Sequence, residues 1–289
     1  MPQMSPKIHF HDDEKLKNIN HETIKLWDKY QIDMSLRELS DRTVSGYKND
    51  LEQWFIYIYD NQGNQCITEL DENDVSEFLY FCKQKGNNSR RMKRRMASIS
   101  AFYKFLQKKR IIKENPMMFI SRPTKDVDIF KQTFLTQEQV DLMRKKLEEN
   151  GDLMLQTYAL FSLSTMARVH AIANLKWEQV DFEQRVCNDV LEKEGKSVTL
   201  FFSDEVKDLL LKLQQYYKDN NINNNGYVFC NKNTNEPMST GTLDEWCKKI
   251  GEMIGVPTLH CHDFRHSGSQ LMKLHGANIE TISSLLNHS

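Results

Sequence analysis

Residues 260–289 have the sequence HCHDFRHSGSQLMKLHGANIETISSLLNHS. Five histidines and one arginine stand in this segment, beside an apolar pattern typical of two helices separated at Gly276. His262 and Arg265 are three positions apart, so a helix places them on one face, with His266 on the adjacent turn. Histidine exchanges protons near neutral pH and arginine binds anions such as phosphate. The segment therefore indicates a site that binds and protonates an anion.

The length and composition are typical of a globular protein large enough for two domains. The chain has 289 residues, of which 39% are hydrophobic and 27% are charged. Its apolar runs are too short to span a bilayer, and residues 1–17 lack the apolar core of a signal peptide, so we expect a cytoplasmic protein without a membrane segment. The six cysteines form no CxxC pair, which argues against a disulfide framework and a zinc ribbon.

The net charge of −1 conceals an uneven distribution. Residues 83–113 contain twelve lysines and arginines and no acidic residue. A solvated helix normally mixes both signs, so an unmixed positive surface indicates a nucleic-acid partner. An apolar stripe at helical spacing runs through the same segment and consists of Met92, Met96, Ile99, Tyr103 and Leu106. The outward side is predicted to bind nucleic acid through Arg90, Arg91, Lys93, Arg94 and Arg95.

Periodicity and turn residues divide the chain into segments. Residues 35–121 follow helical spacing and predict a compact all-helical domain, preceded by an N-terminal arm, helix or loosely held tail at 1–34. Residues 122–133 have weak periodicity and mixed charge, and we interpret them as a linker. Residues 134–289 predict a mainly helical domain whose small antiparallel sheet comes from a hairpin within 180–202.

Further residues suited to phosphate chemistry lie in the second domain. Arg168 stands in an apolar neighbourhood, where a guanidinium needs either an internal salt bridge or a ligand. Lys193 lies at the tip of the predicted hairpin, where it either keeps the surface soluble or serves the site. His288 follows at the end of the last predicted helix. Together with the His-x-x-Arg pair, these side chains could clamp and protonate a phosphate.

Metal binding is the competing interpretation of HCH at 260–262. Adjacent side chains usually point apart, and this spacing is not one that surrounds zinc. A metal hydrolase is therefore the least favoured interpretation, and no metal ligand is predicted.

The chain resembles tyrosine recombinases of the phage-integrase family over roughly residues 35–289. TMARVHAIANLKWEQVDF resembles the family's first arginine box and places the first catalytic arginine at Arg168. EKEGKSVTLFFSDEV resembles the hairpin that carries the catalytic lysine, here Lys193. LHCHDFRHSGSQLMKLHGANIETISSLLNHS resembles the second box and corresponds to His262, Arg265 and His288. The basic helix and NPMMFISRP resemble the DNA-facing part of the family's core-binding domain.

This resemblance implies a helical core-binding domain, a mixed α/β catalytic domain, and a reaction that needs no metal or cofactor. Arg168 and Arg265 would clamp the scissile phosphate, Lys193 would protonate the leaving 5′-hydroxyl, His262 would assist proton transfer, and His288 would hydrogen-bond the phosphate. A tyrosine would attack and form a 3′-phosphotyrosyl intermediate. The implied partners are double-stranded DNA and further copies of the chain, as a tetramer on paired sites.

The sequence departs from the family pattern at the nucleophile. No tyrosine follows Tyr227, which lies in a predicted strand, so we expect the chain as given to be inactive in cleavage. Ala171 also stands where the family usually has an acid. The favoured hypothesis is an integrase of a phage or mobile element whose tyrosine lies beyond Ser289. The alternative is an inactive DNA-binding protein of the same fold that represses transcription.

Overall fold

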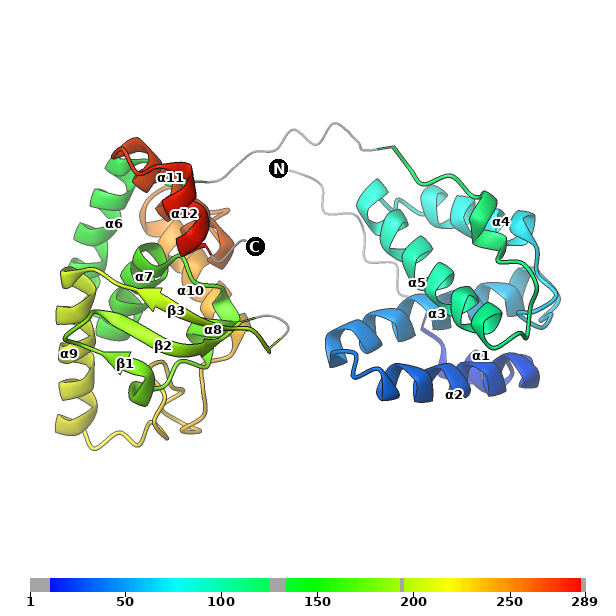
Figure 1. The fold of residues 1–289 in the computed structure, drawn as a ribbon, viewed down its shortest axis with the longest axis horizontal. Helices are drawn as coiled ribbons and strands as arrows, with labels where there is room; N and C mark the ends of the chain where they lie inside the picture. Colours follow the sequence, from blue (N-terminus) through cyan, green and yellow to red (C-terminus); the bar gives the residue numbers. More distant parts are fainter. Residues whose placement is uncertain (1–10, 125–133, 193–194, 287–289) are drawn as a thin grey trace. The chain divides into compact units, whose positions relative to one another are not determined.

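A computed structural model of the chain describes residues 11–124, 134–192 and 195–286 (Figure 1). The chain forms two compact units, and the division between them lies between Ile129 and Phe130, outside the described residues. Most of the predicted linker therefore lies outside them too. Within the described ranges, no helix is long and apolar enough to cross a membrane.

Helices are the only regular elements among the described residues of the first unit, 11–124. Its helices are α1 (Asp13–Lys17), α2 (His21–Leu36), α3 (Asp41–Asn61), α4 (Glu72–Gln84), α5 (Ser89–Lys108) and the 3₁₀ turn η1 (Pro116–Phe119). The starts of these helices follow local side-chain chemistry. Ser40 accepts a hydrogen bond from the backbone of α3, Asp71 forms a capping box with Asp74 on α4, and Asn88 caps α5.

Aromatic side chains fill the core of the first unit. Trp27 and Tyr30 of α2 pack against Phe102 of α5, with ring centroids 6.4 and 5.2 Å apart. The sequence predicts an arm, helix or loosely held tail at 1–34 before the helical domain, and the described part of this range forms α1 and most of α2. α2 continues through that boundary and its apolar stripe, which also includes Met34, is buried in the same core.

The second unit combines helices with one three-stranded sheet. Its elements are α6 (Gln137–Asn150), α7 (Leu153–Thr165), α8 (Val169–Ala173), η2 (Trp177–Gln179), β1 (Val180–Asp181), β2 (Val186–Leu191), β3 (Ser197–Phe201), α9 (Asp204–Asp219), α10 (Thr240–Met253), α11 (Cys261–Leu274) and α12 (Ile279–Leu285). The strands are antiparallel in the order β1-β2-β3, with Leu191 opposite Ser197. The prediction of a mainly α fold with a small antiparallel sheet is confirmed. The predicted strand at 226–231 is present only as the isolated bridges of Tyr227 and Cys230.

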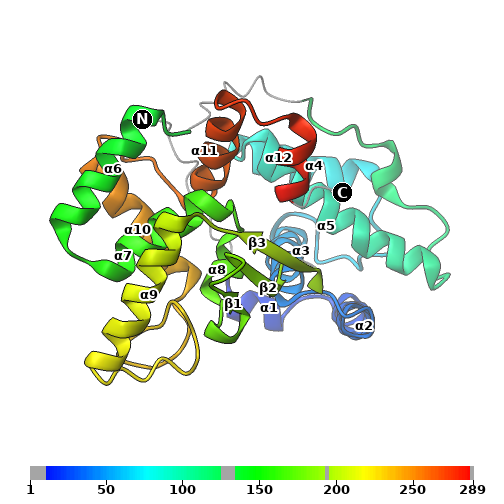
Figure 2. The ribbon, with the colours of Figure 1, turned by 60° about the vertical axis from the view of Figure 1, so that its left-hand side comes forward.

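α7 is the central helix of the second unit, and α9 and α11 pack against it. α7 is buried on nearly every side, as its uninterrupted apolar sequence predicts. The contact with α11 is close at Gly268, where an added Cβ would lie 2.5 Å from the carbonyl oxygen of Leu163 and 2.6 Å from Cγ of Met166. Only glycine permits this approach, which brings α11 to the C-terminal end of α7. α12 lies against α11 in both views (Figure 1, Figure 2).

Candidate active site

The turn between α7 and α8 presents Arg168. α7 ends at Thr165, and the next residue, Met166, adopts a left-handed conformation with φ 53° while its N–H donates to the Ser162 carbonyl at 3.1 Å. Arg168 then has an extended backbone and precedes the first residue of α8, and its carbonyl accepts from the N–H of Ala171 at 2.9 Å. This sharp turn places Arg168 between the two helices, at the start of α8.

The Arg168 guanidinium forms an ion pair with a buried carboxylate. Its Nη1 donates to Oε2 of Glu192, which follows the last residue of β2. The Glu192 side chain is only 2% exposed, whereas that of Arg168 is 36% exposed. The internal salt bridge that the sequence left open for Arg168 is therefore present, and part of the Arg168 side chain remains exposed.

α11 brings Arg265 to the same carboxylate. Nη1 of Arg265 donates to the Met166 carbonyl at 2.6 Å and lies 3.9 Å from Oε1 of Glu192, while Nη2 donates to the Leu286 carbonyl. Burial, together with the nearby positive charge of Arg168, lowers the pKa of Arg265 to about 10. Arg265 therefore stays cationic at neutral pH. The structure thus brings together two of the predicted site residues, Arg168 and Arg265, which are far apart in the sequence.

His262 lies one turn before Arg265 on α11. Its ring centroid is 4.7 Å from that of His266, and the two rings are nearly perpendicular. Burial is the main cause that lowers the pKa of His262, and the charges of His266, Arg265 and Arg168 lower it further. The imidazole is consequently neutral at pH 7 and able to accept a proton, as the predicted assisting role requires.

The side chains of HCH at 260–262 do not converge on one point. His260 pairs with Asp263 through Nδ1 and Oδ2 at 2.7 Å, whereas Sγ of Cys261 lies 3.4 Å from Sγ of Cys247. Among the residues that the structure describes, no group of three or more His, Cys, Asp or Glu could hold a metal ion.

Two predicted site residues, Lys193 and His288, lie outside the described residues. Lys193 directly follows Glu192 in the sequence, and His288 is two positions after Leu286. Their roles as general acid and phosphate ligand stay predictions.

Glu192 is the site residue that the sequence did not predict. An acid beside a lysine at a hairpin tip is typical of a solvated turn, yet this side chain is buried. The cause is a register shift between Cys187 and Val190, where Asp189 has a positive φ of 53°. After this bulge, residues alternate so that Val190 and Glu192 share the inward face. Two-residue spacing from the apolar Val190 is the signal that could have identified it.

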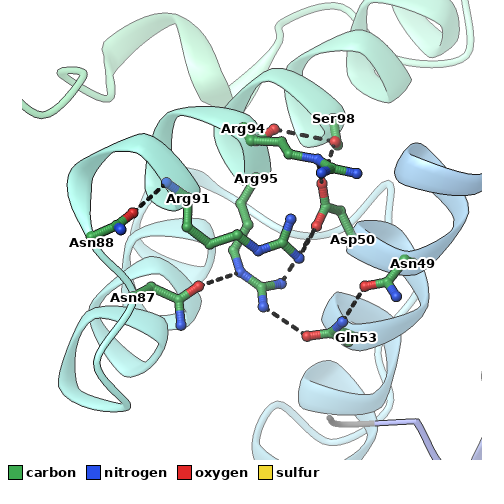
Figure 3. A network of polar contacts seen from close by, with 9 residues as sticks. All are labelled: Asn49, Asp50, Gln53, Asn87, Asn88, Arg91, Arg94, Arg95 and Ser98. Carbon is green, nitrogen blue, oxygen red and sulfur yellow. Dashed lines mark hydrogen bonds and ion pairs between the residues drawn. The ribbon is translucent and has the colours of Figure 1, made fainter. Parts of the chain in front are cut away.

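The predicted DNA-facing helix, α5, contains an arginine that points inward. The sequence predicts that Arg95 faces outward, and this is wrong, because Arg95 is only 1% exposed. Its Nε donates to Asn87 Oδ1 at 2.9 Å, and Nη2 donates to Gln53 Oε1 at 2.7 Å (Figure 3). Arg95 directly precedes Met96 of the apolar stripe, so it lies at the edge of the buried face. There it donates hydrogen bonds to Gln53 of α3 and to Asn87 of the α4–α5 loop.

A single carboxylate, that of Asp50 on α3, is shared by three of the predicted arginines (Figure 3). Arg91 pairs with it directly, Nε of Arg94 lies 3.6 Å away, and Nη1 of Arg95 lies 3.9 Å away. Asp50 is fully buried and also accepts a hydrogen bond from Ser98 Oγ at 2.8 Å.

The outward side of α5 is thus narrower than the sequence predicts. The Arg94 side chain is 58% exposed and that of Arg91 is 29% exposed. Arg90 is exposed and Lys93 is half-buried. The DNA-binding role of these four residues stays a prediction.

Comparison with known protein families matches both units. The Phage integrase family description matches residues 133–289, and the description Phage integrase, N-terminal SAM-like domain matches residues 10–110. The chain therefore belongs to the phage integrase family, whose members are tyrosine recombinases.

Individual relatives match most of the chain. Tyrosine recombinase XerC of Lactobacillus delbrueckii subsp. bulgaricus is 26% identical over 260 residues, covering 87% of this chain and 86% of the relative. Tyrosine recombinase XerD of Oceanobacillus iheyensis is 25% identical over 259 residues, covering 88% and 86%.

Solved structures share the fold. A λ integrase dimer bound to a COC′ core site has a TM-score of 0.70 at 15% identity, covering 92% of this chain and 94% of that one. The Tn1549 transposon integrase in complex with transposon right end DNA has a TM-score of 0.69 at 19% identity, covering 92% and 90%. The two-domain recombinase architecture predicted from the sequence is confirmed.

The buried Asp50 network predicts a stability effect confined to the first unit. Asp50→Asn removes the charge that balances the buried Arg95, and loss of one partner of a buried pair costs about 3 kcal/mol. Amide hydrogen exchange in α3 and α5 should therefore accelerate. Glu22→Gln makes the same charge change in an exposed pair with Lys25 and should leave exchange unaltered. Unchanged exchange in Asp50→Asn would contradict the structural role of the network.

The environment of His262 predicts its titration. NMR should place its pKa below the ordinary value of 6.5, and His266→Gln should raise this pKa without restoring it fully, because burial is the larger cause. The unfolded chain binds this proton more readily than the folded one. The free energy of unfolding should therefore fall as pH drops from 6.5 through the lowered pKa. A His262 that titrates at or above 6.5 would contradict the described environment.

Proposed function

We propose that this protein is a site-specific DNA recombinase that binds double-stranded DNA and clamps one phosphodiester between Arg168 and Arg265 during strand transfer. The observation that carries the proposal is the convergence of these arginines. Arg168 lies in the turn after α7 and Arg265 lies on α11. Arg168 contacts Oε2 of Glu192, and Arg265 lies near Oε1 of the same carboxylate. Membership of the phage integrase family supports the same function.

The arrangement suits stabilisation of charge at phosphorus. Guanidinium groups bind two phosphate oxygens in a planar, bidentate manner and favour charge that develops there during the reaction. The neutral imidazole of His262 can move a proton in the same region. We assign protonation of the leaving hydroxyl to Lys193 and a phosphate hydrogen bond to His288, on the family resemblance alone.

The attacking tyrosine is a separate requirement. No tyrosine follows Tyr227 in the 289 residues. Tyr158 is linked to the site through its hydroxyl, which donates to Sγ of Cys261 at 3.2 Å. However, Tyr158 is completely buried, and burial raises the pKa of its phenol far above the ordinary value. We therefore propose that the 289-residue chain binds the phosphate and does not itself cleave DNA.

DNA is the proposed partner of both units. The structural relatives are integrases in complex with core-site or transposon-end DNA, one of them as a dimer. In the first unit we assign DNA contacts to the accessible basic residues of α5, namely Arg90, Arg91, Lys93 and Arg94. We further propose self-association on paired sites, as a tetramer.

Covalent trapping tests the proposed function. Protein from the complete gene is incubated with nicked duplexes that carry a sequence selected by its own binding, and detergent-stable adducts are separated by electrophoresis. A recombinase should form an adduct that both Arg168→Ala and Arg265→Ala abolish, because each removes one side of the phosphate clamp. Lys145→Gln removes an exposed charge on α6 and is the control that should react normally.

Sequence-specific binding without any adduct would contradict strand transfer. Combined with repression of an adjacent promoter, it would favour the alternative of a DNA-binding regulator with the recombinase fold.

A further inference from the structure

Glu192 lies directly between the two arginines of the site. Its Oε2 accepts a hydrogen bond from Nη1 of Arg168, and its Oε1 lies 3.9 Å from Nη1 of Arg265. Oε1 has no hydrogen-bond partner within the part of the chain that the structure describes. A carboxylate that is 98% buried is costly unless it is paired with positive charge, so its presence beneath two guanidinium groups requires explanation.

The backbone of Glu192 is fixed by the sheet. Its N–H donates to the Lys196 carbonyl at 2.8 Å across the hairpin, and the bulge in β2 turns its side chain inward beside Val190. The Arg168 side chain, in contrast, is long and 36% exposed, and Glu192 is the one side chain among the described residues for which a hydrogen bond to the guanidinium is seen. The rigid partner in this pair is therefore the acid, and the partner that needs orientation is the arginine.

The net charge of Arg168, Arg265 and Glu192 indicates which ligand this group of side chains can bind. Two guanidinium groups and one carboxylate leave a single positive charge, which equals the single negative charge of a phosphodiester. Without Glu192 the two cations would repel each other, and Arg168 would turn towards water.

A second possibility is that Glu192 mimics the phosphate and blocks the site until DNA displaces it. The 2% exposure of its side chain argues against this, because a displaceable mimic would occupy the accessible side of the guanidinium groups. Arg168 is the exposed member of the pair, so the carboxylate lies behind it.

We propose that Glu192 is a positioning residue that holds Arg168 in the orientation in which it binds one DNA phosphate together with Arg265. The inference rests on the proposed function for its substrate. The role is indirect, since Glu192 would act through Arg168 and would not touch the DNA.

Equilibrium binding of a fluorescent duplex to the 289-residue chain tests this role without a cleavage step. Simple electrostatics predicts that removing a negative charge strengthens DNA binding. Positioning predicts the opposite, so Glu192→Gln should weaken binding about tenfold and lower the salt dependence by about one phosphate contact. In an Arg168→Ala background, Glu192→Gln should have no further effect, because its target is gone. Glu252→Gln makes the same charge change on the exposed side of α10 and should not weaken binding.

Two binding outcomes would overturn the proposal. One is Glu192→Gln binding as tightly as the unaltered chain or more tightly. The other is an equal loss with and without Arg168, which would indicate general damage to the fold.

A measurement without DNA separates this inference from the proposed function. In the protein without DNA, the Nε–Hε NMR signal of Arg168 should show that rotation of the guanidinium is restricted. Glu192→Gln should increase this motion, whereas Glu252→Gln should leave it unchanged. If the unaltered chain fails to bind DNA, the proposed function fails and this signal still decides the positioning role. An unchanged Arg168 signal in Glu192→Gln overturns the inference whatever the DNA result.

Discussion

The second unit depends on one buried carboxylate shared by two guanidinium groups. Glu192 directly follows β2, Arg168 lies in a turn between helices, and Arg265 lies in the N-terminal half of α11. A buried charge is tolerated only where its partners are held at contact distance. The hairpin, the turn after Met166 and α11 must therefore keep fixed relative positions, and the missing side chain at Gly268 lets α11 approach closely enough.

The first unit also contains a buried carboxylate that is paired with arginines. Asp50 is fully buried and lies close to three arginines of α5. These arginines differ in how much of each side chain is exposed to solvent. Arg95 is entirely internal, whereas most of the Arg94 side chain remains in solvent. In both units a buried acid pairs with arginines, of which Arg94 and Arg168 keep more than a third of the side chain exposed. The proposed DNA contacts of both units therefore use positive charge that is concentrated locally in a chain of net charge −1.

Much of the fold could be predicted from local chemistry. Helix starts at Ser40, Asp71 and Thr136 follow from residues whose side chains cap the backbone, and the hairpin of the sheet follows from alternation. Helical spacing also placed His262 and Arg265 on one face. The family resemblance, rather than spacing, indicated that Arg168 belongs to the same site.

The remainder depends on contacts between distant segments. Spacing along α5 shows which residues share a face, but the partner that buries Arg95 is on α3, more than forty positions away. A bulge changes the alternation of β2 and leaves no clear mark in a single sequence, so the burial of Glu192 is indicated only by its two-residue spacing from Val190, after the bulge. The inclusion of α2 in the first core likewise depends on Phe102 and Phe105, which lie far from it in the sequence. Lys193 and His288 stay predictions of the resemblance.

The central claim is that Arg168 and Arg265 form one anion-binding site. A crystal structure of the chain with tungstate, whose anomalous scattering locates each ion, tests it most directly. The account predicts one tungstate in contact with both guanidinium groups, on the side opposite Glu192. Separate ions at the two arginines, or an ion at neither of them, would contradict it.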